Sequence, residues 1–270
     1  MLLAVDVGNT DTVFGFYSYQ SESWIAPLRT RSLAEEPAAH YENKLRLHLL
    51  EAAIALNDIE TLVLSCVVPA LLPTLRIMLT RLFGKTPTVV GPDVYPHLTV
   101  QIDHPHEIGS DLVANAVAAF VKYGRNAVIV DFGTALTFTT VSADGKILGV
   151  AIAPGLKTAV KALFANTAQL PEVPLVLPES AIGKNTTHAI QAGILMGYEG
   201  LVRGMITRIR RELDGDCVAL ATGGLSSIIE TLNGEFVEIN KNLTLEGLKF
   251  IGEAAHKTNQ LTQKPTTPNG

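Results

Sequence analysis

The hydrophobic positions in the first half of the chain switch between strand-like and helix-like spacing. Apolar runs at residues 1–7, 12–20 and 23–31 are separated by short polar turns, which predicts three sequential strands. A buried strand at 61–68 that stops at Pro69, a helix at 73–83 and a strand at 87–91 are predicted further along. Between Pro37 and Leu56, apolar residues at helical spacing predict an amphipathic helix: Tyr41, Leu45, Leu49, Ala53 and Leu56.

The second half of the chain repeats this order of elements. Residues 126–133, 136–143 and 146–154 are predicted strands, and residues 142–145 (Ser-Ala-Asp-Gly) form a hairpin turn between two of them. A helix at 156–164, a long helix from about Thr187 to Glu212 and a strand at 217–224 follow. A further amphipathic helix begins near Ser110, with four apolar residues on one face: Val113, Val117, Phe120 and Val121.

This order predicts an α/β fold made of two duplicated ribonuclease-H-like halves. In each half, three meander strands precede alternating helices and strands, so we expect two mixed sheets. The two matched Asp-Gly hairpins described below are expected to face each other across a nucleotide cleft between the halves. We assign residues 1–115 to the first half and residues 116–256 to the second. Residues 257–270 are polar and broken by prolines, so we expect a frayed or disordered tail.

Composition narrows the class of protein. Of the 270 residues, 47% are hydrophobic and 17% are charged, which favours a compact globular enzyme over a disordered chain. The net charge of −5 gives no reason to expect a nucleic acid or an anionic membrane as partner. Cys66 and Cys217 lie in apolar runs without metal-ligand spacing and are expected to be buried thiols. Because we see neither a signal peptide nor an apolar run long enough for a membrane span, we expect a cytoplasmic protein.

One motif occurs twice, nearly half a chain apart. An apolar run ends in Asp6 or Asp131, and a glycine follows two residues later, at Gly8 and Gly133. Such a turn lets a carboxylate and bare N–H groups face one small space, where a metal-bound polyphosphate can be held. Each aspartate alone is equally compatible with a simple turn cap. Two copies in matched contexts favour a paired phosphate site.

Other polar clusters have two interpretations each. Ser110 and Asp111 begin a predicted helix, where they are expected as an N-cap pair or as part of a reactive site. If Asp111 lies there, the helix dipole is expected to lower its pKa. Residues 222–224 (Thr-Gly-Gly) either form an ordinary turn or let a planar base approach the backbone. His104 and His106 suggest a metal site, but a solvated loop is the better interpretation of their spacing around a proline.

Seven sequence motifs make the chain resemble a known protein family. They are DVGNTDTVFG, VVPALLPTL, GSDLVANAVAA, VIVDFGTALTF, AIAPGL, IGKNTTHAIQAGI and ATGG. Their order and spacing resemble those of type III pantothenate kinases, over about residues 1–256. The resemblance implies the fold of actin, sugar kinases and heat-shock chaperones, phosphorylation of pantothenate by ATP with Mg²⁺, and a homodimer.

The resemblance also implies roles for individual residues. Asp111 would be the general base, Asp131 would hold a monovalent cation such as K⁺ or NH₄⁺, and Thr134 would contact ATP. Asn185 or Thr186 would cap the long helix, and Thr186 would contact pantothenate. The remaining pantothenate-binding positions are Gly109, Ser110, Asp111 and Leu112. The ATP-binding stretch comprises Asp6, Val7, Gly8, Asn9, Thr10, Asp11, Thr12 and Val13.

The chain departs from the family pattern mainly on the substrate side. Leu112 stands where the family usually has an arginine, and Leu cannot grip an anion bidentately. Ile102 replaces a tyrosine, and His104 replaces an asparagine before Pro105. Two alternatives therefore stay open, a non-catalytic accessory relative and a kinase of another small hydroxy acid. Further departures are Thr139 for aspartate and Gly149-Val150 for paired glycines.

Overall fold

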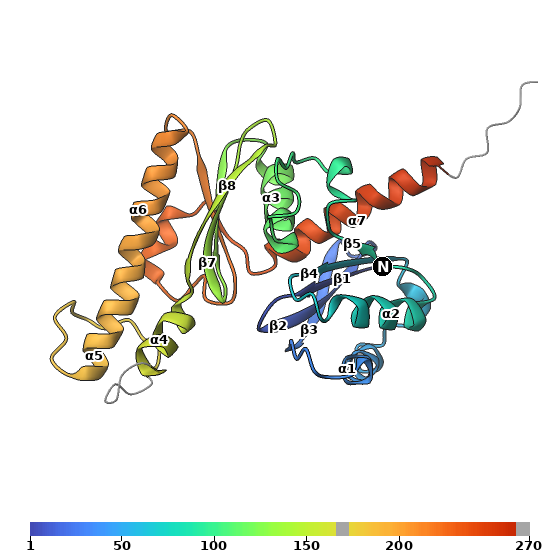
Figure 1. The fold of residues 1–270 in the computed structure, drawn as a ribbon, viewed down its shortest axis with the longest axis horizontal. Coiled ribbons are helices and arrows are strands. Elements are labelled where there is room, and N and C mark those ends of the chain that lie inside the picture. Colours follow the sequence, from blue (N-terminus) through green and yellow to red (C-terminus); the bar gives the residue numbers. More distant parts are fainter. Residues whose placement is uncertain (166–172, 263–270) are drawn as a thin grey trace, which may run out of the picture. The chain divides into compact units, whose positions relative to one another are not determined.

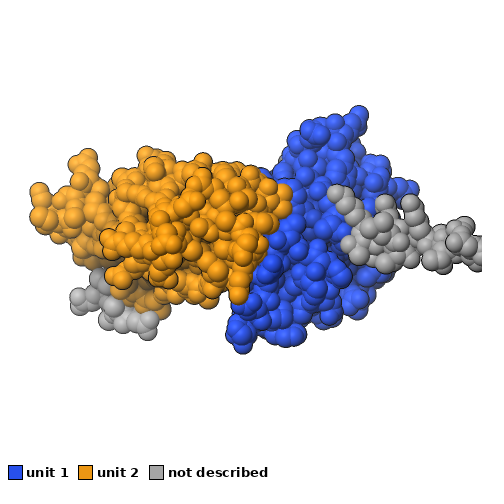
Figure 2. Space-filling view, turned by 90° about the horizontal axis from the view of Figure 1, so that it is seen from above, with its two compact units in different colours: residues 1–118, 244–270 blue, residues 119–243 orange. Residues whose placement is uncertain are grey.

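A computed structural model describes residues 1–165 and 173–262 of the chain. These residues form two compact units, coloured separately in Figure 2. Unit 1 contains residues 1–118 and the chain from Thr244 onward, and unit 2 contains residues 119–243. The chain therefore passes between the units within helix α3 (Ser110–Tyr123) and at the first residue of helix α7 (Leu243–Thr262).

The sheet of unit 1 is mixed, with strand order β3-β2-β1-β4-β5 (Figure 1). The first three strands form an antiparallel meander, and the other two run parallel to β1. All five predicted strands are present, although the fifth is shorter than predicted. Their bounds are β1 (Leu2–Val7), β2 (Asp11–Ser18), β3 (Ser23–Arg31), β4 (Thr61–Cys66) and β5 (Thr88–Val89).

Helices cover both faces of this sheet, because alternate residues of β1 point to opposite faces. Leu3, Val5 and Val7 pack with side chains of α1 (Ala38–Glu51) and α2 (Leu72–Phe83). The face that carries Asp6 is covered by α3 and α7, which approach it closely. Short 3₁₀ turns at Leu56–Asp58 and Tyr95–His97 complete unit 1.

Helix α7 corrects the sequence prediction for the C-terminal region. No element was assigned to residues 225–256, and residues up to 256 were assigned to the second half. In the structure a Cβ on Gly247 would lie 1.9 Å from the Ala114 carbonyl oxygen, and one on Gly252 would lie 2.4 Å from Val63. These two glycines let the α7 backbone pack directly on α3 and β4 of unit 1. Residues 257–262 of the predicted tail continue this helix, and residues 263–270 lie outside the described residues.

Unit 2 repeats the topology of unit 1, with strand order β10-β9-β6-β7-β8. Again three strands form an antiparallel meander and two run parallel to the first. The predicted α/β fold with two duplicated mixed-sheet halves is therefore confirmed. The strands are β6 (Ala127–Phe132), β7 (Ala135–Val141), β8 (Ile147–Pro154), β9 (Val218–Thr222) and β10 (Glu238–Ile239).

One face of this second sheet packs against helices. Val128 and Val130 of β6 share a core with Leu195 and Val202 of the long helical run. That run was predicted as one helix and consists of α5 (Thr186–Gln191), a π-helical turn (Ala192–Met196) and α6 (Gly197–Glu212). Helix α4 (Leu156–Ala165) and a 3₁₀ turn at Glu230–Glu235 complete the described part of unit 2.

No helix in residues 1–165 or 173–262 has the length and apolar character that a membrane crossing requires.

Candidate active site

The turn between β1 and β2 is the first predicted phosphate hairpin. The Gly8 N–H donates to the Asp11 carbonyl oxygen at 3.0 Å and closes a tight turn with Asn9 and Thr10 at its exposed tip. The tip is therefore the part of the predicted ATP-binding stretch that a phosphate can reach. Val7 and Thr12 are fully buried, and the Thr12 hydroxyl bonds to the Ser32 hydroxyl at 2.8 Å.

The first residue of α3 anchors that helix to the end of β4. The buried Ser110 hydroxyl lies 2.9 Å from the Ser65 hydroxyl and accepts the Cys66 N–H at 3.2 Å. Ser65 is paired in register with Asp6 of the neighbouring strand. Since β1 and β4 are parallel, their carboxyl ends meet at one edge of the sheet, where α/β proteins commonly bind ligands. Ser110 fixes the start of α3 at this edge.

Asp111 follows this anchor and is largely shielded from solvent. Its Oδ1 accepts the Leu112 N–H at 2.8 Å, and a Cβ on Gly109 would lie 2.5 Å from the same oxygen. Glycine at 109 therefore leaves room for the carboxylate. Burial raises the pKa of Asp111 above its usual value, and hydrogen bonds from backbone N–H groups lower it less. The net direction is therefore opposite to the predicted lowering by the helix start, because desolvation outweighs the backbone donors.

Tyr95 and Cys66 are two residues of this edge to which the sequence assigned no role in the site. Cys66 was expected to be a buried thiol like Cys217, but it is only partly buried. Burial and, to a smaller extent, the nearby Asp111 carboxylate raise the pKa of Tyr95 to about 12. Burial also raises the pKa of the Cys66 thiol, to which Asp6 contributes. Tyr95 follows β5 as Cys66 ends β4, so both lie at the carboxyl ends of parallel strands. Recognising the strand order would have grouped them with Asp6.

The turn between β6 and β7 is the second predicted phosphate hairpin. The Gly133 N–H donates to the Ala135 carbonyl oxygen at 3.1 Å, and Thr134 is exposed at the tip. The Thr134 carbonyl accepts the Gly155 N–H at 3.1 Å and the Thr158 hydroxyl at 2.7 Å. The start of α4 is thus bonded to the tip of the hairpin.

Gly155 and Gly223 allow two other segments of unit 2 to pack unusually close to this hairpin. A Cβ on Gly155 would lie 2.3 Å from the Gly133 carbonyl oxygen, which excludes any side chain there. Gly223 has a φ of +90°, and its Cβ would lie 2.5 Å from Asp131 Oδ1. The segment of residues 222–224 and the first turn of α4 therefore both pack around the Asp131 hairpin.

The oxygen atoms around Asp131 suit a hard cation. Thr137 and Thr222 are the residues paired with Asp131 on the two neighbouring strands, and both are buried. Carboxylate and hydroxyl oxygens are ligands that hard cations prefer. Within the described residues no group of three or more His, Cys, Asp or Glu side chains is arranged for a metal, so the loop with His104 and His106 carries no such site.

A cavity of about 270 Å³ lies within unit 2 and is lined in part by residues of α4. Two of its lining segments follow the close-packed glycines along the chain. One starts at Lys157, after Gly155, and the other starts at Leu225, after Gly223. The lining is apolar apart from two lysines, and consists of Lys157, Val160, Lys161, Val173, Leu175, Leu225 and Ile228.

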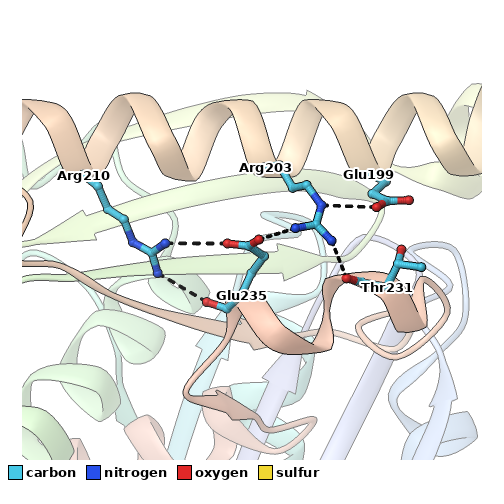
Figure 3. A network of polar contacts seen from close by, with 5 residues as sticks. All are labelled: Glu199, Arg203, Arg210, Thr231 and Glu235. Carbon is cyan, nitrogen blue, oxygen red and sulfur yellow. Dashed lines mark hydrogen bonds and ion pairs between the residues drawn. The ribbon is translucent and has the colours of Figure 1, made fainter.

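A polar network joins α6 to the 3₁₀ turn at Glu230–Glu235 (Figure 3). Arg203 forms ion pairs with Glu199 and Glu235 and donates to the Thr231 carbonyl oxygen. Arg210 forms an ion pair with Glu235 as well. The 3₁₀ turn that follows the cavity wall is thereby fastened to α6. The residues are Glu199, Arg203, Arg210, Thr231 and Glu235.

Thr186, the other residue predicted to contact pantothenate, lies far from Asp111 along the chain and belongs to the other unit. Asn185 is the N-cap of α5, and its Oδ1 accepts the His188 N–H at 2.9 Å. Thr186 is the first, exposed residue of that helix in unit 2, whereas Asp111 belongs to unit 1. That Thr186 and Asp111 act on one substrate, and that Asp6 and Asp131 meet at one nucleotide, stay predictions.

Comparison with known proteins decides the family. The sequence model described as type III pantothenate kinase matches residues 2–208. This chain belongs to the type III pantothenate kinase family. A type III pantothenate kinase of Moorella thermoacetica is 41% identical over 253 residues, covering 94% of this chain and 99% of the relative. One of Treponema pallidum is 43% identical over 254 residues, covering 93% of each.

Two solved structures share the overall fold of this chain. A conserved putative Baf family transcriptional activator from Campylobacter jejuni matches with a TM-score of 0.58 and 16% identity, covering 95% of this chain and 100% of the other. A putative 2-dehydro-3-deoxygalactonokinase from Sinorhizobium meliloti matches with a TM-score of 0.54 and 13% identity, covering 100% and 99%. At these identities the matches establish the two-sheet architecture alone.

Proposed function

We propose that this protein transfers the γ-phosphate of ATP to the primary hydroxyl of pantothenate, with Asp111 as the general base. The product would be 4′-phosphopantothenate, and the reaction would be the first step toward coenzyme A. The observation that carries the assignment is the position of Asp111 in a chain of this family. Its carboxylate sits at the start of a helix anchored to the carboxyl edge of the first sheet.

The environment of Asp111 suits proton abstraction. Burial raises the pKa of this carboxyl, which makes its carboxylate a stronger base than a solvated aspartate. The hydrogen bond from the Leu112 N–H occupies Oδ1 and holds the group in one orientation. The second oxygen can then accept the proton of the attacking hydroxyl. Phosphoryl transfer otherwise depends on positioning and on charge stabilisation.

The two hairpin tips are proposed to hold the phosphates. N–H groups and hydroxyls at Asn9, Thr10 and Thr134 would donate to phosphate oxygens, as tight glycine turns commonly do. Mg²⁺ bound with ATP, and K⁺ or NH₄⁺ held by Asp131, would neutralise the charge of the transferred group. Thr186 would bind pantothenate.

The cavity beside α4 is proposed to take the base of ATP. Its lining includes the first turns of α4, the helix whose start bonds to the Thr134 carbonyl oxygen. Its apolar walls suit a planar purine, while Lys157 and Lys161 favour an anionic ligand. Leu225→Arg would fill the cavity and add charge, so we expect a raised KM for ATP with the KM for pantothenate unchanged. Leu177→Arg, on a residue packed against the same core outside the cavity lining, is the matched control.

The central test is ATP turnover with and without pantothenate in potassium buffer. Wild-type protein should form ADP only when pantothenate is present, and Asp111→Asn should reduce kcat by about 10²–10⁴. Asp93→Asn, which changes an exposed aspartate of the same unit, should leave kcat unchanged. Wild-type turnover in the Asp111→Asn protein would contradict the assignment of the base.

Leu112 favours a second candidate, a relative that binds nucleotide but phosphorylates pantothenate weakly or not at all. The residue belongs to the proposed substrate segment and cannot form the charge-assisted contact of an arginine. If wild-type protein binds ATP but shows no pantothenate-dependent turnover at saturating substrate, this second candidate replaces the first.

We also propose that the protein acts in the cytoplasm as a homodimer. Large apolar side chains on unit 2 support self-association: Leu148 is 48% exposed, Ile152 is 70% exposed and Ile182 is 77% exposed. Leu148 and Ile152 lie on β8, an edge strand of the second sheet. Light scattering after gel filtration should give twice the chain mass of 28.9 kDa. A monomer at micromolar concentration would contradict the dimer.

A further inference from the structure

Thr137 carries a buried hydroxyl that the described residues leave without a hydrogen bond. The Oγ1 atom is shielded from solvent, the residue is 8% exposed, and no partner for this atom exists among residues 1–165 and 173–262. A buried hydroxyl without a partner destabilises a protein, so such an atom calls for an explanation.

The position of Thr137 suggests the missing partner. Thr137 lies directly opposite Asp131 in the antiparallel pair of β6 and β7. Directly opposed residues point to the same face, with Cβ atoms about 4.5–5.5 Å apart. The hydroxyl and the carboxylate therefore share one side of the sheet, next to the second phosphate hairpin.

The chemistry of the two groups selects a cation over an anion. An ionised carboxylate only accepts hydrogen bonds, and it repels the phosphate oxygens that a hydroxyl alone would attract. A hard cation instead uses carboxylate and hydroxyl oxygens together. Gly223 packs closely against the same carboxylate, since a Cβ at this position would lie 2.5 Å from Asp131 Oδ1.

We propose that the Thr137 hydroxyl is a second protein ligand of the monovalent cation at Asp131. This inference rests on the proposed function only for the cation at Asp131, not for the base or for the substrate. Thr137 then positions the cation by fixing its distance from β7, and it does not touch pantothenate.

The test measures cation binding by the ligand-free protein rather than turnover. The thermal unfolding midpoint is titrated with KCl, with choline chloride keeping the ionic strength constant, which gives an apparent K⁺ dissociation constant. Thr137→Val keeps the shape of the side chain and removes the oxygen. We expect K⁺ to bind about ten-fold more weakly, the effect of losing about 1.4 kcal/mol. In choline chloride alone this variant should be at least as stable as wild type, because an orphan hydroxyl has been removed.

Three variants serve as controls. Thr137→Ser retains the oxygen and should bind K⁺ like wild type. Thr139→Val removes a hydroxyl on the same face of β7, opposite Ile129 rather than Asp131, and should also bind K⁺ normally. Asp131→Asn should lose the K⁺ response, and adding Thr137→Val to it should then change nothing further.

The outcomes separate the inference from the proposed function. An unchanged K⁺ response in Thr137→Val, or an equal loss in Thr139→Val, would overturn the role of Thr137. A wild-type protein without any K⁺ response would overturn the cation site even if it phosphorylates pantothenate. A normal set of K⁺ responses in a protein that fails to phosphorylate pantothenate would support the site and refute the proposed reaction.

Discussion

Ser110→Ala tests whether the anchor of α3 sets the position of the base. The substitution removes one hydroxyl that bonds to the Ser65 hydroxyl and to the Cys66 N–H. The side chain is 7% exposed and Ser65 is fully buried, so water cannot easily replace the lost bonds. The Cys66 N–H and the Ser65 hydroxyl would be left buried and unsatisfied.

The magnitude follows from the number of groups left without partners. Each buried unsatisfied group costs about 1–3 kcal/mol, and partial relaxation brings the expected loss for Ser110→Ala to about 2–3 kcal/mol. Ser65→Ala should cost less, about 1 kcal/mol, because the Ser110 hydroxyl still accepts the Cys66 N–H. The double variant removes both hydroxyls and leaves only the Cys66 N–H unpaired. It should therefore be no less stable than Ser110→Ala alone.

Two measurements check this reasoning. Urea unfolding gives the free energies of the four proteins in the cycle, and amide hydrogen exchange reports the Cys66 N–H directly. The Cys66 amide should exchange faster in Ser110→Ala and nearly normally in Ser65→Ala. Pantothenate-dependent kcat should fall in Ser110→Ala, since Asp111 follows the anchor. Additive losses from the two substitutions, or an unchanged Cys66 amide, would refute the anchor.

Three further predictions concern the base, the substrate segment and the second hairpin. Because the folded pKa of Asp111 lies above its usual value of 3.8, ionisation of this carboxyl costs stability. The full cost is present above the folded pKa, declines as pH falls below that pKa and is gone below 3.8. Asp111→Asn should therefore be more stable than wild type at pH 7 by thermal unfolding, and the difference should vanish in acid. Leu112→Arg should lower the KM for pantothenate by about ten- to a hundred-fold, the worth of a charge-assisted bond of roughly 1.5–3 kcal/mol, and tight wild-type binding that arginine does not improve would contradict this. Gly155→Ala should weaken ATP binding and lower stability, because its Cβ would lie 2.3 Å from the Gly133 carbonyl, whereas Gly193→Ala, with open space around it, should do neither.

The fold was predictable from sequence where local pattern and chemistry agreed. Apolar runs ending in Asp6 and Asp131 located the central strand of each sheet, and the two sheets repeat one strand order. Helix α7 was missed, although Leu245, Leu248 and Ile251 are buried, because Gly247 and Gly252 interrupt its pattern. Those glycines serve close packing against unit 1, and a local pattern does not reveal which element a helix will meet.

The candidate site was predictable only in part, for a related reason. Motif strings led to Asp111 and to the hairpins, but Tyr95 and Thr137 sit in unremarkable contexts along the chain. Their significance comes from register and burial, since Thr137 matters through its position opposite Asp131. The pKa of Asp111 was predicted with the wrong sign because desolvation depends on tertiary packing, which the sequence does not display.

The placement of α7 has a consequence for how the chain is made. Ribosomes deliver residues in order, and domains usually complete themselves from the N-terminus onward. Here unit 1, whose strands precede unit 2 along the chain, needs a helix that is synthesised after unit 2, because α7 covers the face of the first sheet that carries Leu2 and Val63. Unit 2 is continuous from residue 119 to residue 243 and has all its strands before α7 emerges. The second repeat is therefore expected to fold before the first, and a nascent chain that stops near residue 243 would expose an apolar sheet face for chaperones or proteases to recognise.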